Sequence, residues 1–133
     1  MRVIITGAAG GIGSQLVEEL FGRHELCLID RSPVTGGRSS ITADLSKCHP
    51  WTRWRRWLGF SRYPRWMDAF EAADVAVHLA VDQRRGVPER QLLLNNMQMT
   101  LNVIEAAARH RVSRIVFASS NWAVKALERE IAP

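Results

Sequence analysis

Short apolar runs alternate along this chain with longer segments in which apolar residues recur every three or four positions. The runs are rich in β-branched residues and end at charged or turn-forming residues, as in Val3-Ile4-Ile5 near the start. Such runs are typical of strands in a parallel sheet that is buried on both faces. They predict five strands, at residues 3–5, 25–30, 41–45, 74–80 and 114–118.

The segments between these runs predict helices. Behind the first strand, Ile12, Leu16 and Leu20 recur at helical spacing, with polar residues on the opposite side. Residues 66–73 predict a helix before the fourth strand, and residues 89–110 predict a long helix before the fifth. The apolar face of the long helix is predicted to consist of Leu92, Leu93, Met97, Leu101, Ile104 and Ala108. The alternation predicts a single α/β domain, residues 1–133, with a doubly wound parallel sheet of order 3-2-1-4-5 between two layers of helices.

Three glycines, Gly7, Gly10 and Gly13, join the first strand to its helix at three-residue spacing. The first turn of a helix has backbone N–H groups without intrahelical partners, and the helix dipole places positive charge there. A pyrophosphate satisfies both wherever no Cβ blocks its approach. We therefore predict a Rossmann-like dinucleotide site at this turn, with Gly11 and Ile12 also in contact with the cofactor. The spacing is not G-x-G-x-x-G, so the match rests on mechanism and context, and an ordinary glycine-rich turn is the alternative.

Asp30 ends the second strand, near the interval after the glycines that is expected for a carboxylate bound to a ribose 2′-hydroxyl. Taken alone, an aspartate at a strand end is more often a turn or cap residue. Beside the glycine turn, the ribose role is favoured. A carboxylate repels a 2′-phosphate and so predicts NAD, whereas the adjacent Arg31 could accommodate that phosphate and keeps NADP as the alternative. After the third strand, Asp44 and Leu45 suit an adenine pocket.

The formal net charge is +5, and nearly all of the positive charge is arginine. Arginines gather with Trp51, Trp54 and Trp57 in an insertion at about residues 47–65. Arginine interleaved with aromatic residues can bind single-stranded nucleic acid, a membrane surface or a protein. We favour a surface insertion whose tryptophans pack on the domain, because one segment of this size makes a small footprint. A protein partner or a homodimer contact through residues 51–65 is the alternative, and nucleic acid is the least favoured partner.

Several classes of protein are excluded by composition. No run of about eighteen apolar residues occurs, so no membrane span is predicted. The chain opens directly in a strand, so no secretory signal is expected. Cys27 and Cys48 are not closely spaced, and we expect reduced thiols, no metal site and a cytoplasmic protein.

Six stretches together resemble the NAD-dependent epimerase/dehydratase family of the extended short-chain dehydrogenase/reductase superfamily, whose members act on sugars and nucleotide sugars. They occur in family order and cover nearly the whole chain outside the insertion: ITGAAGGIG (5–13), the acid of LIDRS (28–32), ADLS (43–46), DVAVHLA (74–80), NNMQMTLNVIEAA (95–107) and RIVFASSN (114–121). The SSN ending also looks like the uronate dehydrogenase branch. The resemblance implies an oxidoreductase-type cofactor domain that moves hydride to and from a nicotinamide.

The resemblance also implies a role for individual residues. The expected cofactor contacts follow the dinucleotide from its pyrophosphate through adenosine to the nicotinamide ribose: Gly7, Gly10 and Gly13, then Asp30, then Asp44 and Leu45, and finally Leu79 and Ala80. Asn96 matches the asparagine that supports the active-site backbone. Ser120 matches the catalytic Ser/Thr that hydrogen-bonds the substrate hydroxyl or carbonyl.

Two departures from the family pattern stand out. Met99 replaces the glycine before Thr100 in N-x-x-G-T, which we expect helix packing to tolerate. The general acid/base of the family is a tyrosine in Y-x-x-x-K, but the one tyrosine here, Tyr63, lies in the insertion and Lys125 has no tyrosine partner. His78 is expected to be a buried, hydrogen-bonded histidine rather than a replacement. We expect the cofactor-binding half of such an enzyme, without the C-terminal substrate region, or else a non-catalytic NAD(P)-binding regulatory or interaction module.

Overall fold

A computed structural model describes residues 1–34, 39–47 and 63–119 of the chain. Its centre is a five-stranded parallel sheet in the order β3-β2-β1-β4-β5. The strands are β1 (Arg2–Thr6), β2 (Glu25–Asp30), β3 (Ser39–Thr42), β4 (Val75–His78) and β5 (Arg114–Phe117). The parallel direction and the strand order confirm the predicted fold, although β3 ends before the predicted residues 43–45.

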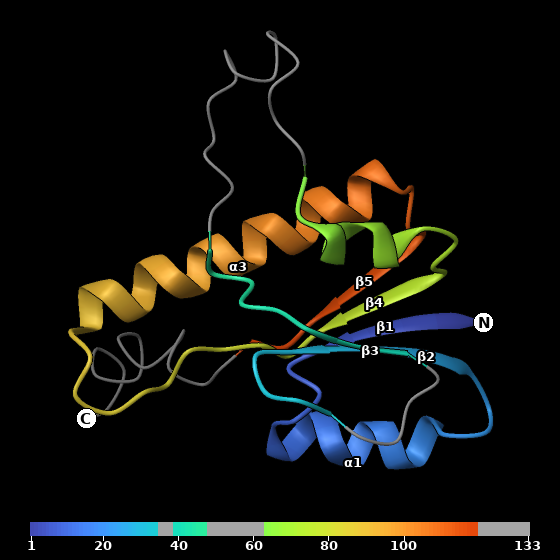
Figure 1. The fold of residues 1–133 in the computed structure, drawn as a ribbon, viewed down its shortest axis with the longest axis horizontal. Coiled ribbons are helices and arrows are strands. Elements are labelled where there is room, and N and C mark those ends of the chain that lie inside the picture. Colours follow the sequence, from blue (N-terminus) through green and yellow to red (C-terminus); the bar gives the residue numbers. More distant parts are fainter. Residues whose placement is uncertain (35–38, 48–62, 120–133) are drawn as a thin grey trace, which may run out of the picture.

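Helices cover both faces of this sheet. The helix α1 (Gly11–Leu20) lies on one face, and α3 (Glu89–Arg109) lies on the other together with η1 (Arg65–Phe70) (Figure 1). The segment predicted as a helix at 66–73 is a shorter 3-10 helix. It still buries its apolar residues, and the rings of Trp66 and Phe70 meet edge to face at 6.1 Å. The three-layer arrangement follows from strands that are apolar on both sides.

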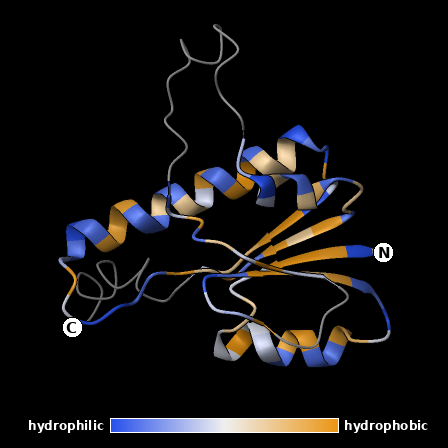
Figure 2. Cartoon of the chain, in the orientation of Figure 1, coloured by the Kyte–Doolittle hydropathy of each residue, from blue (hydrophilic) through white to orange (hydrophobic). Residues whose placement is uncertain are grey.

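Alternate residues of the central strands face opposite layers, and both sets are buried. The strand residues on the side of α3 and η1 are Ile4, Cys27, Ile29 and Ala76. Those on the side of α1 are Val3, Ile5, Leu26, Leu28 and Val77. The central strands accordingly stand out as apolar in Figure 2, between helices in which polar and apolar residues alternate.

The long helix packs with a different face from the predicted one. Its buried residues are Met99, Asn102, Val103, Ala106 and Ala107. The side chains of Leu93, Met97, Leu101 and Ile104, on the predicted face, are between 47% and 59% exposed. Apolar residues occur on two sides of α3, so periodicity alone does not identify the inner one. The small alanines allow the closer approach to the sheet.

The first helix packs as predicted at Leu16 and Leu20, which lie against the core, and departs from the prediction at Ile12. Ile12 is 70% exposed, whereas α1 buries Gly13 and Val17. The helix lies close to the turn that precedes it, so the residue at the contact is a glycine. The neighbouring isoleucine then faces outward.

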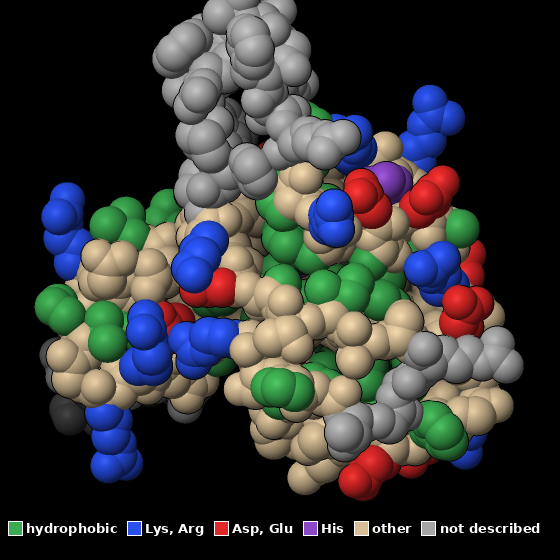
Figure 3. Space-filling model, viewed as in Figure 1, with side chains coloured by type: hydrophobic (Ala, Val, Ile, Leu, Met, Phe, Trp, Pro, Cys, Tyr) green, Lys and Arg blue, Asp and Glu red, His purple; other side chains and the backbone are tan. Residues whose placement is uncertain are grey.

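Several predicted features lie outside the described residues. They are Trp51, Trp54, Trp57, Cys48 and Ser120. Within the described part, no helix is both long and apolar enough to cross a bilayer. On the face seen in Figure 3, the side chains of Lys and Arg are interspersed with those of Asp and Glu. The described residues on that face therefore form no continuous basic surface.

Candidate functional site

The turn between β1 and α1 requires glycine at two positions. Gly7 has a φ of +74°, and a Cβ there would lie 2.6 Å from the backbone nitrogen of Ala80. A Cβ on Gly13 would overlap the carbonyl oxygen of Gly7. Gly7 therefore permits both a left-handed turn and the close passage of the chain after β4. Gly13 permits the close packing of α1 on the turn.

The start of α1 is open to a ligand. Gly10 occupies the N-cap position, no side chain caps the helix, and the first turn holds no acidic residue. Gly10 and Gly11 are exposed. The N–H groups of this turn and the positive end of the helix dipole thus face an open pocket instead of a side chain. Such a helix start favours a bound anion, above all a phosphate.

Asp30 is fixed at the end of β2 beside the glycine turn. Its Oδ2 accepts a hydrogen bond from the backbone N–H of Ala9 at 3.0 Å, and its Oδ1 accepts one from that of Ser32 at 2.8 Å. The backbone of the turn is joined to the same strand, because Gly7 N–H donates to the carbonyl of Ile29 at 2.9 Å. A carboxylate held in this way can still accept from a ligand hydroxyl, since each oxygen has a second lone pair.

Asp44 and Leu45 lie just beyond β3. The hydroxyl and the backbone N–H of Ser46 donate to Asp44 Oδ1 at 2.6 Å and 3.0 Å. Burial raises the pKa of the Asp44 carboxyl, but the bonds from Ser46 and the charges of Lys47 and Arg31 outweigh burial and leave that pKa below its ordinary value. Leu45 is 3% exposed and joins the core. Asp44 is therefore charged and half-buried, while Leu45 is fully packed in the core.

A groove runs along the carboxyl ends of the strands. One end has a volume of about 270 Å³ and is lined by Gly7, Ala9, Gly10, Asp30, Arg31, Asp44, Leu45, Leu79, Ala80 and Asp82, among others. The other end has a volume of about 860 Å³, and its lining includes Gly11, Ile12, Gly13, His78, Arg84, Asn96, Thr100, Phe117 and Ser119. Gly7, Gly10, Arg31, Leu79 and Ala80 line both ends. The two ends are therefore parts of one groove that passes the start of α1.

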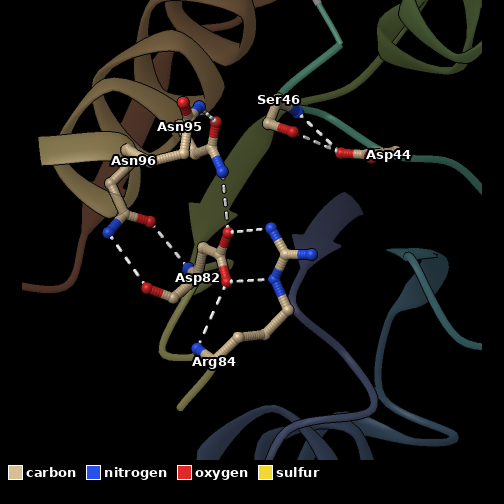
Figure 4. Close-up of polar contacts among 7 residues, drawn as sticks. Asp44, Ser46, Asp82, Arg84, Asn95 and Asn96 are labelled. Atoms are coloured by element: carbon tan, nitrogen blue, oxygen red, sulfur yellow. Dashed lines mark hydrogen bonds and ion pairs between the residues drawn. The ribbon is translucent and has the colours of Figure 1, made fainter. Parts of the chain in front are cut away.

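The segment after β4 is tied to α3 by a polar network (Figure 4). The side chain of Asn96 accepts from the backbone N–H of Asp82 at 2.6 Å and donates to the Asp82 carbonyl at 3.2 Å. The Asp82 carboxylate accepts from Asn95 at 2.8 Å and from two nitrogens of Arg84, each at 2.8 Å. The hydrogen bonds from Arg84, followed by those from Asn95, hold the pKa of Asp82 well below its usual range.

His78 is a buried residue of the groove floor. Its Nδ1 lies 2.7 Å from the Thr6 hydroxyl, and its Nε2 lies 3.4 Å from the Thr100 hydroxyl. Because Thr100 donates its proton to the Asn96 carbonyl at 3.0 Å, the ring proton belongs on Nε2, and Nδ1 accepts from Thr6. Burial lowers the pKa of His78 from 6.5 to about 4. The ring is therefore neutral at pH 7, and it is buried and hydrogen-bonded, as predicted.

The structure gathers the predicted cofactor residues along this one groove. Those around the narrower end come from β1, β2, the segment after β3 and the segment after β4. Asn96 lines the wider end, and its side chain bonds the backbone N–H and carbonyl of Asp82. Ser120 is outside the described residues, and Ser119 lines the wider end.

Sequence reasoning missed Asp82 and Arg84. The available signal was an acid and an arginine two residues apart, directly after the fourth strand, at the sheet edge where ligands bind. Two charged residues at this spacing also occur in ordinary loops, so the pair did not identify a site. Among the described residues, no group of three or more His, Cys, Asp or Glu could hold a metal ion.

Known proteins are similar to this chain over most of its length. The family model described as the NAD dependent epimerase/dehydratase family matches residues 3–130. An NAD-dependent glucose-6-phosphate dehydrogenase of Haloferax volcanii is 27% identical over 95% of this chain and 45% of its own length. A uronate dehydrogenase of Pseudomonas putida is 33% identical over 92% of this chain and 42% of its own length. The chain thus spans less than half the length of these curated relatives.

A solved structure is similar to this chain as well. A point mutant of uronate dehydrogenase from Agrobacterium tumefaciens, complexed with NAD, is similar with a TM-score of 0.64 and 31% identity. The match covers 90% of this chain and 41% of that one.

Proposed function

Because this chain belongs to the NAD-dependent epimerase/dehydratase family, we propose that it binds NAD and forms the cofactor domain of a sugar or nucleotide-sugar oxidoreductase or epimerase. The groove along the carboxyl ends of the strands carries this proposal. A dinucleotide laid in it has its adenosine beside Asp30 and Asp44 and its phosphates at the start of α1. Its nicotinamide then lies toward Phe117 and Ser119.

The choice of NAD rests on Asp30. Its carboxylate is held by two backbone N–H groups, so it stays at the end of β2 and can accept from the 2′-hydroxyl of the adenosine ribose. A 2′-phosphate in that place would meet the negative charge at short range. Arg31 is exposed and lines both ends of the groove, so NADP binding is the weaker alternative.

The substrate class comes from the relatives. Their names include dehydrogenases of glucose-6-phosphate, L-arabinose and uronate. In this proposal the cofactor takes hydride from, or returns it to, a carbon of such a sugar. Asn96 keeps the segment after β4 in place at the wider end of the groove. Ser120, which follows the groove residue Ser119, hydrogen-bonds the reacting hydroxyl.

A second candidate is a cofactor-binding module without catalysis that signals to a partner through residues 51–65. The observation in its favour is the place of Tyr63, the one tyrosine of the sequence. Its ring packs against the guanidinium of Arg109, 3.8 Å from the ring centre, and it does not line the groove. A group that accepts the hydroxyl proton in hydride transfer must touch the substrate.

Calorimetric titration of the 133-residue chain with NAD and NADP tests the proposal. We expect NAD to bind at one site with a dissociation constant below about 1 mM and NADP to bind at least about tenfold more weakly. Absence of NAD binding by a folded chain would refute the proposal. NAD binding without reduction of NAD by sugar acids, aldoses or sugar phosphates would favour the module.

A further inference from the structure

The segment after β4 presents an arginine whose position is set before any ligand arrives. Nε and Nη2 of Arg84 each donate to the Asp82 carboxylate at 2.8 Å, which is a bidentate pair. The side chain of Asp82 is 4% exposed, whereas that of Arg84 is 51% exposed. A buried carboxylate thus holds a guanidinium at the surface.

The carboxylate is itself fixed. Asn95 donates to it at 2.8 Å, and Asn96 bonds both the N–H and the carbonyl of Asp82. Both asparagines belong to α3, so Arg84 is positioned relative to the helix layer rather than to a free loop. The rotamer entropy that an arginine normally loses on binding a ligand is largely lost already in this arrangement.

One side of the guanidinium remains available. Because Nε and Nη2 face Asp82, Nη1 points away from the carboxylate, as Figure 4 shows. Arg84 lines the groove together with Gly10, Gly11 and Arg31. The free N–H groups therefore face the wider end of the groove, which the glycine turn also lines.

We propose that Arg84, clamped by Asp82, binds the pyrophosphate of the dinucleotide from the side of the groove opposite the start of α1. Backbone N–H groups of α1 then hold one side of the phosphates and a guanidinium holds the other. Guanidinium N–H groups bind phosphate oxygens with short, charge-assisted hydrogen bonds. This inference rests on the proposed function, because it assigns a residue to the same cofactor.

The test compares ligands with and without phosphates. Arg84→Gln is titrated with NAD, ADP and adenosine, beside the wild-type chain and the matched control Arg85→Gln, whose exposed arginine does not line the groove. We expect Arg84→Gln to weaken NAD and ADP by about tenfold and to leave adenosine unchanged. Arg85→Gln should leave all three affinities unchanged. Added salt should weaken ADP binding more steeply in the wild type than in Arg84→Gln.

Arg84→Lys separates charge from geometry. A lysine keeps the charge but cannot form the bidentate clamp, so we expect its affinity for ADP to lie between those of the wild type and Arg84→Gln.

Two results would overturn the inference while NAD binding stands. The first is equal ADP affinity in Arg84→Gln and the wild type, including the case in which the variant instead loses affinity for a sugar acid such as glucuronate. The second is an equal loss for ADP and adenosine, which would mean that Arg84 only shapes the segment. A folded wild-type chain that binds neither NAD nor ADP would refute the proposed function itself.

Discussion

Asn102 on α3 donates its side-chain N–H to the carbonyl oxygen of Leu45, 2.7 Å away and 57 residues earlier in the chain. Asn102 is 4% exposed, and its Oδ1 accepts from Gln98 at 2.8 Å. This bond ties the helix layer to the segment after β3, where Asp44 enters the groove.

Replacing Asn102 should therefore affect both stability and the adenosine end. In Asn102→Ala the Leu45 carbonyl loses its buried donor, so we expect the free energy of unfolding to fall by about 1–3 kcal/mol. Urea denaturation measures the loss, and adenosine titration should show weaker binding. In the control Gln98→Ala, Asn102 can still donate to Leu45, and adenosine affinity should be retained. If the two variants bind adenosine with equal affinity, the bond from Asn102 to Leu45 does not shape the adenosine end of the groove.

The glycine turn gives a sharp pair of variants. Gly13→Ala places a Cβ against the Gly7 carbonyl, whereas Gly11→Ala places one in open space, with no atom within 4 Å apart from its chain neighbours and the backbone of its own helix. We expect Gly13→Ala to lower the free energy of unfolding by at least about 3 kcal/mol, at the upper end of overpacking effects. Gly11→Ala should fold as well as the wild type, because alanine suits a helix better than glycine.

Thermal unfolding of the two glycine variants measures the difference. A Gly13→Ala chain as stable as the wild type would mean that α1 does not need to approach the turn so closely.

Acid should destabilise the chain through His78. Its pKa is lowered from 6.5 to about 4 in the fold, so between these values the unfolded chain binds the proton and the folded one does not. Stability is then fully present above pH 6.5 and falls as the pH approaches 4, by about 3 kcal/mol in total. Urea titrations from pH 7.5 to about 4, compared with His78→Gln, measure this contribution.

The pH slope of stability should be flatter in His78→Gln than in the wild type over that range. Equal slopes would assign the acid sensitivity to other groups. Protonation of Asp82 adds a further loss only at lower pH, because its bonds to Arg84 keep its pKa well below the usual range.

Asp30 should decide between the two dinucleotides. In Asp30→Asn the charge that opposes a 2′-phosphate is lost, so we expect NAD affinity to fall by about tenfold and the preference over NADP to shrink or vanish. Competition titrations with both cofactors measure this. Glu18→Gln removes the same charge from an exposed position on α1 that does not line the groove, and it should keep the preference. If Asp30→Asn keeps the preference for NAD over NADP, Arg31 rather than Asp30 would determine which dinucleotide binds.

The strands and the glycine turn were predictable because they depend on local chemistry, and the strand order followed from the doubly wound pattern that they form together. Apolar β-branched runs identify buried parallel strands, and Gly7 and Gly13 stand where a Cβ would meet backbone. Asp30 was predictable from its distance to that turn. The inner face of α3 was not, because Met97 and Leu101 are as apolar as the buried Val103. Only the packed sheet selects between the two sides of the helix.

The polar contacts of the site were not predictable for a related reason. Asn102 reaches a carbonyl 57 residues away, and Asp82 is held by two asparagines of a helix that begins after it. Such bonds depend on how separate elements meet in space, and no spacing within one segment encodes them.

The register at Thr6 has a consequence for how this site can change. Thr6 pairs with Ile29 on one side and His78 on the other, so three adjacent strands fix the groove floor by their own ladders. The residues that follow those strands, such as Gly7 and Leu79, line the groove above this floor. Substitutions in the segments after the strands can therefore reshape the groove while the ladders of β1, β2 and β4 below it keep their register.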